Sequence, residues 1–151
     1  MDLELPKDFK EFFELLNAGE VRYLLIGGYA VGIYGYSRTT NDLDILIASD
    51  VENIKNLKAA LFQFLGGETE LGEILFENER GILEIGVEPM KIQILNFADG
   101  IEFEAAYGAR NIVDVEDITI DTISKQDLIR NKTATGRFKD LADIERLERI
   151  D

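Results

Sequence analysis

The sequence contains no cysteine and no histidine among its 151 residues. The absence of cysteine excludes disulfide bonds and thiolate metal sites. The absence of histidine excludes zinc sites built on imidazole and every mechanism in which histidine is the base or the nucleophile. Any catalysis by this chain must therefore rest on carboxylates, hydroxyls, lysine, arginine or a hard metal ion.

Long apolar runs are missing as well, since no stretch approaches the roughly 20 residues that a membrane span needs. The first eight residues carry three acidic residues and one lysine, and they lack the basic and apolar regions of a signal peptide. We therefore expect a cytoplasmic protein without a membrane partner. Hydrophobic residues make up 46% of the chain, which is enough for a core, and the length suits a single domain over residues 1–151.

Positive charge is scarce, because the formal net charge is -14. A field of this sign repels polyanions and argues against unspecific coating of nucleic acid or of an anionic membrane. Residues 125–151 are different, since they hold seven of the sixteen basic residues and only six of the thirty acidic ones. This nearly neutral segment is where a local cationic patch is easiest to build.

The hydrophobic pattern predicts helices and short strands in one α+β (or α/β) domain with a small mixed β-sheet flanked by helices. A capping box of Ser49 and Glu52, and Ser124 with Asp127, are expected to start two of the helices. We place a core at about 1–120 and a helical C-terminal segment at about 121–151. Helices are expected at 9–16, 29–35, 51–65, 101–107, 124–134 and 138–150, strands at 21–26, 42–47, 74–76, 82–87 and 91–96, and a broken strand within 113–120.

A glycine pair, Gly27 and Gly28, ends the first expected strand and opens a helix. Such a turn presents free backbone N–H groups and the positive end of a helix dipole where a phosphate can approach closely. Glycines also occur at strand-to-helix turns because they permit tight packing. The pair alone leaves both interpretations open.

Two aspartates add a more specific signal, because Asp42 and Asp44 stand two residues apart on an expected strand. Strand side chains alternate, so both carboxylates lie on one face with Cα atoms about 6.6 Å apart. Carboxylates at this spacing can converge on a hard divalent cation, Mg²⁺ or Mn²⁺. Residues 45–48 that follow are apolar, which argues against a pair of aspartates that merely cap an exposed strand.

Together these residues resemble a known signature. The glycine pair, a short helix and then residues 38–44 (Arg-Thr-Thr-Asn-Asp-Leu-Asp) resemble the motif of the DNA polymerase β-type nucleotidyltransferase superfamily. The form with arginine and threonine before the acidic pair is similar to small bacterial nucleotidyltransferase-like proteins that include abortive-infection and toxin–antitoxin toxins. A second block also fits, and it consists of Lys132, residues 136–140 (Gly-Arg-Phe-Lys-Asp) and Asp143.

The resemblance implies a nucleotidyltransferase fold and transfer of a nucleotide from a nucleoside triphosphate to an RNA or protein hydroxyl with Mg²⁺, with an antitoxin or other protein as a further partner. It implies that Asp42 and Asp44 hold the metal ions and are catalytic. The residues implied to bind the nucleotide are Gly27, Gly28, Arg38, Thr39, Lys132, Arg137 and Lys139. For Arg38 an ordinary solvated loop charge is an equal alternative, and for the last three residues the alternative to a cationic patch is a solvated helix face with common ion pairs.

The sequence departs from the signature at the third acidic position, where active members carry a carboxylate on a neighbouring strand. The residue at this catalytic position is Gln93. An amide cannot act as a general base, although its carbonyl oxygen can still bind a hard cation. Glu84 and Glu88 are near in sequence, but their spacing assigns them no role. The alternative function is therefore a catalytically degenerate module that binds a nucleotide or a protein.

Overall fold

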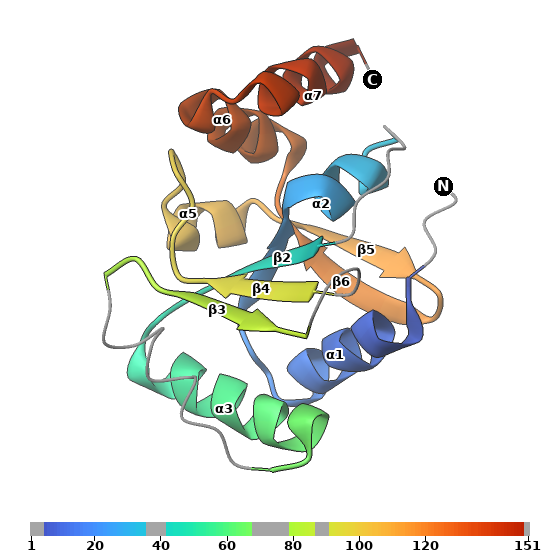
Figure 1. Cartoon of the computed structure of the whole chain (residues 1–151), viewed down its shortest axis with the longest axis vertical. Helices are drawn as coiled ribbons and strands as arrows, with labels where there is room; N and C mark the ends of the chain where they lie inside the picture. The colour runs from blue at the N-terminus through green and yellow to red at the C-terminus, as the bar shows by residue number, and fades with distance from the viewer. Residues whose placement is uncertain (1–4, 36–41, 68–78, 87–90, 150–151) are drawn as a thin grey trace.

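The computed structural model describes residues 5–35, 42–67, 79–86 and 91–149. These residues form helices and strands in the order expected for an α+β domain (Figure 1). The elements are α1 (Lys7–Ala18), β1 (Tyr23–Ile26), α2 (Gly27–Ile33), β2 (Asp42–Ile47), α3 (Val51–Leu65), β3 (Ile82–Ile85), β4 (Lys91–Leu95), α5 (Phe103–Gly108), β5 (Asn111–Val115), β6 (Ile118–Thr122), α6 (Lys125–Thr135) and α7 (Phe138–Arg149).

The strands form one mixed six-stranded sheet in the order β3-β4-β2-β1-β6-β5. Strand β2 pairs antiparallel with β1 and parallel with β4, while β3 and β5 are antiparallel to β4 and β6. The end of β1 therefore lies beside the beginning of β2, as Ile26 pairs with Asp44. This register brings the glycine pair and the aspartate pair to the same edge of the sheet, and the expected mixed sheet is confirmed.

Helices α1 and α3 lie together against one side of the sheet, and α2, α6 and α7 lie toward the opposite side (Figure 1). Helix α1 buries Phe9, Phe12, Phe13 and Leu16, which follow the helical period. The ring of Phe13 packs 5.7 Å from that of Tyr23 on β1, measured between ring centroids. Apolar burial of this kind, at about 25 cal/mol per Å², holds the helical layer to the sheet.

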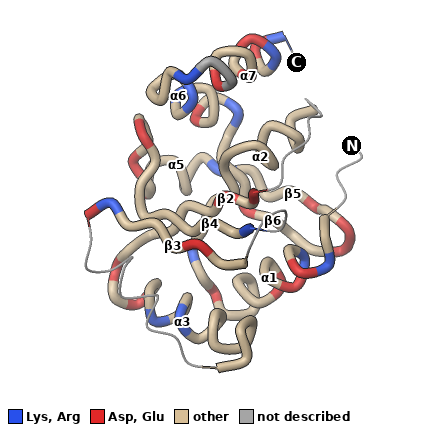
Figure 2. Tube along the Cα trace, viewed as in Figure 1, with Lys and Arg blue, Asp and Glu red and all other residues tan. Residues whose placement is uncertain are grey.

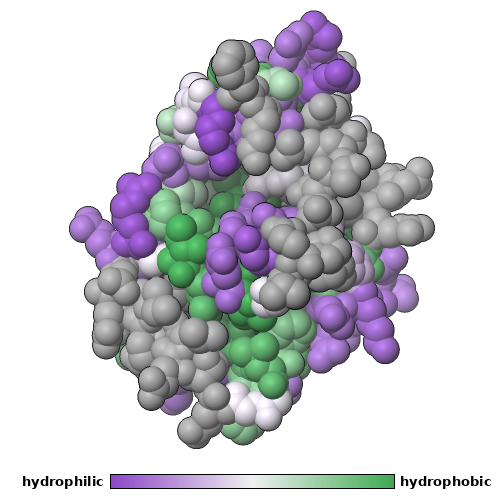
Figure 3. All heavy atoms as spheres, in the orientation of Figure 1, coloured by the Kyte–Doolittle hydropathy of each residue, from purple (hydrophilic) through white to green (hydrophobic). Residues whose placement is uncertain are grey.

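The space-filling view shows where this core comes to the surface (Figure 3). Hydrophobic atoms gather in the middle of the viewed face, over β3 and β4, and hydrophilic atoms cover the region of α6 and α7 above them. In Figure 2, basic and acidic residues are mixed along α6 and α7, as the nearly neutral composition of this segment predicts. No helix within the described residues is long and apolar enough to cross a membrane.

The helix starts were only partly predicted. Ser124 caps α6 by accepting a hydrogen bond from the backbone N–H of Asp127, as expected. The capping box of Ser49 and Glu52 is wrong, because Asp50 is the N-cap of α3 and accepts from the backbone N–H of Asn53. An aspartate in this position also faces the positive helix end, which favours its charge.

Two strand predictions need comment. The broken strand expected within 113–120 is a hairpin of β5 and β6, and its turn residues Glu116 and Asp117 have positive φ values of 46° and 72°. Strand β6 runs to Thr122, slightly beyond the expected end of the core at residue 120. The strand expected at 74–76 lies outside the described residues.

Candidate active site

A row of side chains crosses the sheet from β3 to β1. Glu84 pairs with Gln93, Gln93 pairs with Asp44, and Asp44 pairs with Ile26 just before Gly27. Cross-strand partners of this kind lie about 4.8 Å apart and point to the same face. Residues far apart in sequence thus meet at one place.

Asp42 and Asp44 have the alternation that the sequence predicted. On β2, Leu43 and Ile45 are fully buried on the core side, and the two aspartates are half-buried on the other side. Within the described part of the chain, no hydrogen bond is made to Oδ1 of Asp42, although this atom is buried. A buried carboxylate oxygen needs a partner, and a cation supplied from outside the chain would satisfy it.

Gly27 is required by the position of Asp44. Its φ of +72° is one that residues with a side chain rarely adopt, and a Cβ atom here would collide with the Asp44 carboxylate, whose Cγ would lie 3.1 Å away. The backbone of the glycine turn therefore lies directly against the carboxylate. This close approach explains why residue 27 is a glycine, which the sequence alone did not explain.

Gln93 lies beside Asp44 and is bound from its other side. Its amide nitrogen Nε2 donates a hydrogen bond of 3.0 Å to Oε1 of Glu84. The carboxylate of Glu84 is also 3.6 Å from Nζ of Lys91, the residue paired with Asp42. Glu84 thus contacts the site through Gln93, a relation that sequence spacing did not reveal, and Glu88 lies outside the described residues.

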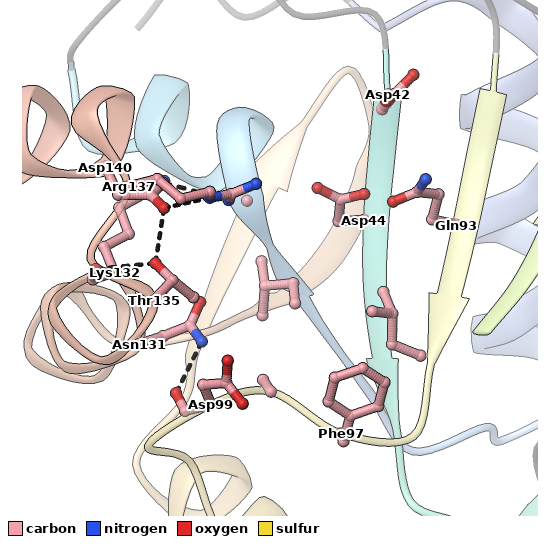
Figure 4. Close-up of a pocket in the computed structure, with 14 residues that line it drawn as sticks. Asp42, Asp44, Gln93, Phe97, Asp99, Asn131, Lys132, Thr135, Arg137 and Asp140 are labelled. Carbon is pink, nitrogen blue, oxygen red and sulfur yellow. Dashed lines mark hydrogen bonds and ion pairs between the residues drawn. The ribbon is translucent and has the colours of Figure 1, made fainter. Parts of the chain in front are cut away.

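These residues open into a cavity of about 540 Å³ between the sheet and the α6–α7 hairpin (Figure 4). Its size is within the range of small-molecule sites. The lining combines the acidic edge of β2, an apolar wall after β4, and polar side chains of α6 and α7. The lining residues are Ile26, Gly27, Asp42, Asp44, Gln93, Leu95, Phe97, Ala98, Asp99, Asn131, Lys132, Thr135, Arg137 and Asp140.

Lys132 occupies a different environment from the open cationic patch that the sequence suggested. It is buried, and its Nζ lies 3.1 Å from Oδ1 of Asp140 and 3.0 Å from Oδ2 of Asp143, both buried as well. The charge of Lys132 is therefore matched inside the hairpin, because a buried ammonium needs paired carboxylates.

Asp140 is the centre of this network. Burial acts to raise the pKa of its carboxyl, but hydrogen bonds from Arg137, Thr135 and Lys132 outweigh burial and lower the pKa to about 2. Nε of Arg137 donates at 2.6 Å and Oγ1 of Thr135 also donates at 2.6 Å, both to Oδ2. The side chain of Arg137 is 61% exposed, so the guanidinium also faces the cavity and solvent.

Six of the predicted site residues line this one cavity: Gly27, Asp42, Asp44, Gln93, Lys132 and Arg137. Gly28 is buried in α2 and does not line it. Arg38 and Thr39 lie outside the described residues, as does the side chain of Lys139.

Sequence reasoning assigned no site role to several other lining residues, among them an aromatic residue and three polar ones. Phe97 and Asp99 follow β4, and Asn131 and Thr135 lie on α6. Nδ2 of Asn131 donates a hydrogen bond of 2.8 Å to the backbone oxygen of Asp99, which ties α6 to the loop after β4. In the sequence, only the spacing of four residues between Asn131 and Thr135 indicates that they lie on the same face of a helix.

The donor set at the edge of β2 fits a hard divalent cation. It consists of the carboxylates of Asp42 and Asp44 and the amide of Gln93, all of them oxygen-bearing groups, with a buried carboxylate oxygen among them. No group of three acidic side chains that could hold a metal occurs in the described ranges. The set therefore suits an ion that completes its coordination with water and ligand phosphates, as Mg²⁺ does.

Comparison with known proteins agrees on the fold. No protein-family model and no curated protein matches the sequence. Among solved structures, the lincosamide antibiotic adenylyltransferase LnuA has a TM-score of 0.65 at 18% identity, with 97% of this chain and 98% of that chain covered. The antibiotic-resistance factor ANT(2″)-Ia has a TM-score of 0.62 at 14% identity, covering 93% and 80%. A protein from Thermotoga maritima described as a nucleotidyltransferase has 0.57 at 13%, covering 93% and 86%.

The similarity extends over nearly the whole chain and includes the mixed sheet and its helices. At identities this low the comparison establishes architecture and leaves chemistry to the residues of the site. The fold that the glycine and aspartate motifs led us to expect is thus confirmed. The chain has the nucleotidyltransferase fold.

Proposed function

We propose that this chain is a nucleotidyltransferase that moves a nucleotide from a nucleoside triphosphate to an acceptor hydroxyl, with Mg²⁺ or Mn²⁺ as the metal. The observation that supports this most strongly is the convergence of Asp42, Asp44 and Gln93 beside the Gly27 turn, at the edge of a cavity of about 540 Å³. The site is large enough for a nucleotide, and its oxygen donors match the ion that accompanies one.

The positions of the residues that line the cavity indicate the role of each. Asp42 and Asp44 would hold the metal, and Gln93 would add an amide oxygen. When bound, such an ion neutralises charge on the phosphates and on the leaving pyrophosphate. Gly27 allows the chain to approach the triphosphate closely, and Arg137 presents a partly exposed guanidinium that suits phosphate oxygens.

In the reaction, the acceptor oxygen would form a bond to the α-phosphorus, and the bond from that phosphorus to pyrophosphate would break. Gln93 cannot take the proton of the acceptor hydroxyl, because an amide is not a base at neutral pH. The proton must pass to another group or to water. We expect slower transfer than in a site with a third carboxylate.

The acceptor is proposed as an RNA or protein hydroxyl, in line with a toxin of a toxin–antitoxin pair. The similar protein LnuA is an adenylyltransferase for lincosamide antibiotics, and a structure of ANT(2″)-Ia contains adenylyl-2″-tobramycin. A small hydroxylated molecule is therefore an acceptor class to include in tests. The net charge of -14 disfavours a long RNA except where the α6–α7 segment receives it.

A second candidate function is a nucleotide- or protein-binding module without transfer activity. Gln93 favours it, since this residue replaces the carboxylate expected of active members. The two functions share the same nucleotide site. They differ in whether the α-phosphorus of the nucleotide becomes bonded to an acceptor.

Transfer of a labelled α-phosphate to an acceptor distinguishes the nucleotidyltransferase from the binding module. Each of the four nucleoside triphosphates, labelled in the α-phosphate, is incubated with Mg²⁺ and three acceptor pools: total RNA, a protein extract, and hydroxylated antibiotics including lincomycin and tobramycin. We expect one triphosphate to label one pool and the Asp44→Asn variant to label none. Binding of a triphosphate without labelling of any pool would contradict transfer and support the binding module.

A further inference from the structure

Glu84 is the neighbour of Gln93 on the side away from Asp44. The pairing register places Glu84, Gln93 and Asp44 in one row on three adjacent strands, β3, β4 and β2. Glu84 is about half exposed, with 53% of its side chain accessible, so it is not a core residue. Its carboxylate accepts a hydrogen bond from the amide of Gln93 and lies 3.6 Å from the ammonium of Lys91, the residue paired with Asp42.

The hydrogen bond between Glu84 and Gln93 fixes the direction of the amide. An ionised carboxylate can only accept hydrogen bonds, so the group that faces Glu84 must be the amide nitrogen, at 3.0 Å from Oε1. The amide oxygen then lies on the other side, toward Asp44, as Figure 4 shows. Without Glu84 the amide could turn, because its nitrogen and oxygen have nearly the same shape.

We propose that Glu84 is a positioning residue that holds the oxygen of Gln93 toward the divalent cation of the site. This inference rests on the proposed function and specifies how its metal site works without a third carboxylate. Asp42 and Asp44 supply charge, and Gln93 supplies a neutral oxygen whose direction is set by its neighbour. Partners of this kind orient metal ligands, and their loss costs about 10- to 100-fold in metal affinity.

The arrangement also explains why glutamine suits this chain at position 93. A carboxylate there would face the carboxylate of Glu84 at hydrogen-bond distance, and two like charges so close repel each other. Lys91 offsets part of the charge of Glu84, from 3.6 Å. Glu84 and Gln93 therefore form a matched pair, and the effect of replacing one of them on metal binding depends on which residue stands at the other position.

Binding of Mn²⁺, followed by the paramagnetic resonance signal of the free ion, tests the pair without requiring activity. Glu84→Ala removes both the acceptor and the charge, and we expect Mn²⁺ affinity to fall about 10-fold. Glu84→Gln removes the charge but keeps an oxygen that accepts from Gln93. The Mn²⁺ affinity of this variant should stay within about threefold of the original, because Glu84 is half exposed and water weakens the attraction between its charge and the ion. Equal losses in the two variants would overturn positioning and leave only a charge effect.

A second comparison measures the effect of Glu84→Ala on Mn²⁺ affinity in a protein that also carries Gln93→Asp. Here Glu84 has no amide to orient, so Glu84→Ala should change Mn²⁺ affinity by no more than about threefold, the effect of losing its charge alone. A loss as large as in the original background would also overturn the proposal, because coupling between the two positions would then be absent. Thermal unfolding of every variant confirms that it is folded before the titration.

The Mn²⁺ titrations also distinguish a wrong metal site from a wrong role of Glu84. If the unaltered protein binds no Mn²⁺, or if Asp44→Asn leaves binding unchanged, the metal site itself is wrong and the inference falls with it. If the unaltered protein binds Mn²⁺ through Asp44 and the Glu84 variants bind equally well, only the positioning role is wrong.

Discussion

Gly27 is the residue whose identity the site constrains most tightly. Two independent conditions exclude a side chain there: a φ of +72° and the presence of the Asp44 carboxylate where a Cβ would stand. Strain of this kind typically costs about 1–3 kcal/mol. The glycine therefore serves stability and the close approach of the backbone to the acidic edge at the same time.

We predict that Gly27→Ala lowers the free energy of unfolding by about 2 kcal/mol or more, since the backbone strain and the collision with Asp44 add together. Gly108→Ala is the matched control, because a Cβ at Gly108 meets nothing within 4 Å and the residue ends helix α5. That variant should be neutral or slightly more stable. Urea unfolding of both variants checks this, and a Gly27→Ala protein as stable as the control would contradict the assigned conformation.

Residue by residue, the sequence predicted side chains whose position follows from local periodicity. Asp42 and Asp44 could be placed on one face because strand alternation has a period of two. The contact of Glu84 with Gln93 could not be predicted, because it depends on the register between β3 and β4, which periodicity alone does not determine. The burial of Lys132 could not be predicted either, since its partners Asp140 and Asp143 belong to the next helix.

At the scale of elements, the α6–α7 hairpin is held by the buried network of Lys132, Asp140 and Asp143. The pKa of Asp140 is about 2 in the folded chain and about 3.9 in an unfolded one. The unfolded chain therefore binds a proton more readily in this interval. The stabilisation is complete above about pH 4 and is lost as the pH falls through about 2, a change of about 2–3 kcal/mol.

We predict that the free energy of unfolding falls more steeply between about pH 4 and pH 2 in the unaltered protein than in Asp140→Asn, since the variant has no carboxyl to protonate at this position. Glu145→Gln is the control, because Glu145 pairs with Arg149 on the exposed face of α7. It should leave the slope nearly unchanged. Urea midpoints across the pH series measure the slopes, and parallel curves for Asp140→Asn and the original would contradict the role of this network.

Boundaries of elements were predicted well where a capping residue or a glycine marks the end. Ser124 and the left-handed Gly66 both stand where the sequence placed a helix end. The start of α3 at residue 51 was predicted, but its N-cap was misplaced by one residue, because Ser49 and Asp50 are both good caps and only tertiary contacts choose between them. Asp50 also pairs with Arg22 at 2.6 Å, which fixes its position.

At the scale of the whole molecule, the fold brings three distant segments to one cavity. The turn after β1, the row across β2 and β4, and the α6–α7 hairpin each supply part of the lining. The sequence predicted the class of fold because motifs and periodicity agreed. It could not predict the cavity, because the cavity depends on how the α6–α7 hairpin packs over the sheet, and neither motifs nor net charge report that packing.

The central claim is that Asp42 and Asp44 form a metal-dependent site for a nucleoside triphosphate. The most direct test is thermal unfolding with each of the four triphosphates, with and without Mg²⁺, in the unaltered protein and in the Asp42→Asn/Asp44→Asn double variant. Asp114→Asn/Asp117→Asn, on the exposed β5–β6 hairpin, removes the same charge away from the cavity and serves as the control.

A triphosphate at about 100 times its dissociation constant stabilises the folded state by about 2.7 kcal/mol, which raises the melting temperature by several degrees. We expect this rise for at least one triphosphate, only with Mg²⁺, in the unaltered protein and the control, and not in the Asp42/Asp44 variant. No rise with any triphosphate, or an equal rise in the Asp42/Asp44 variant, would contradict the assignment of the site.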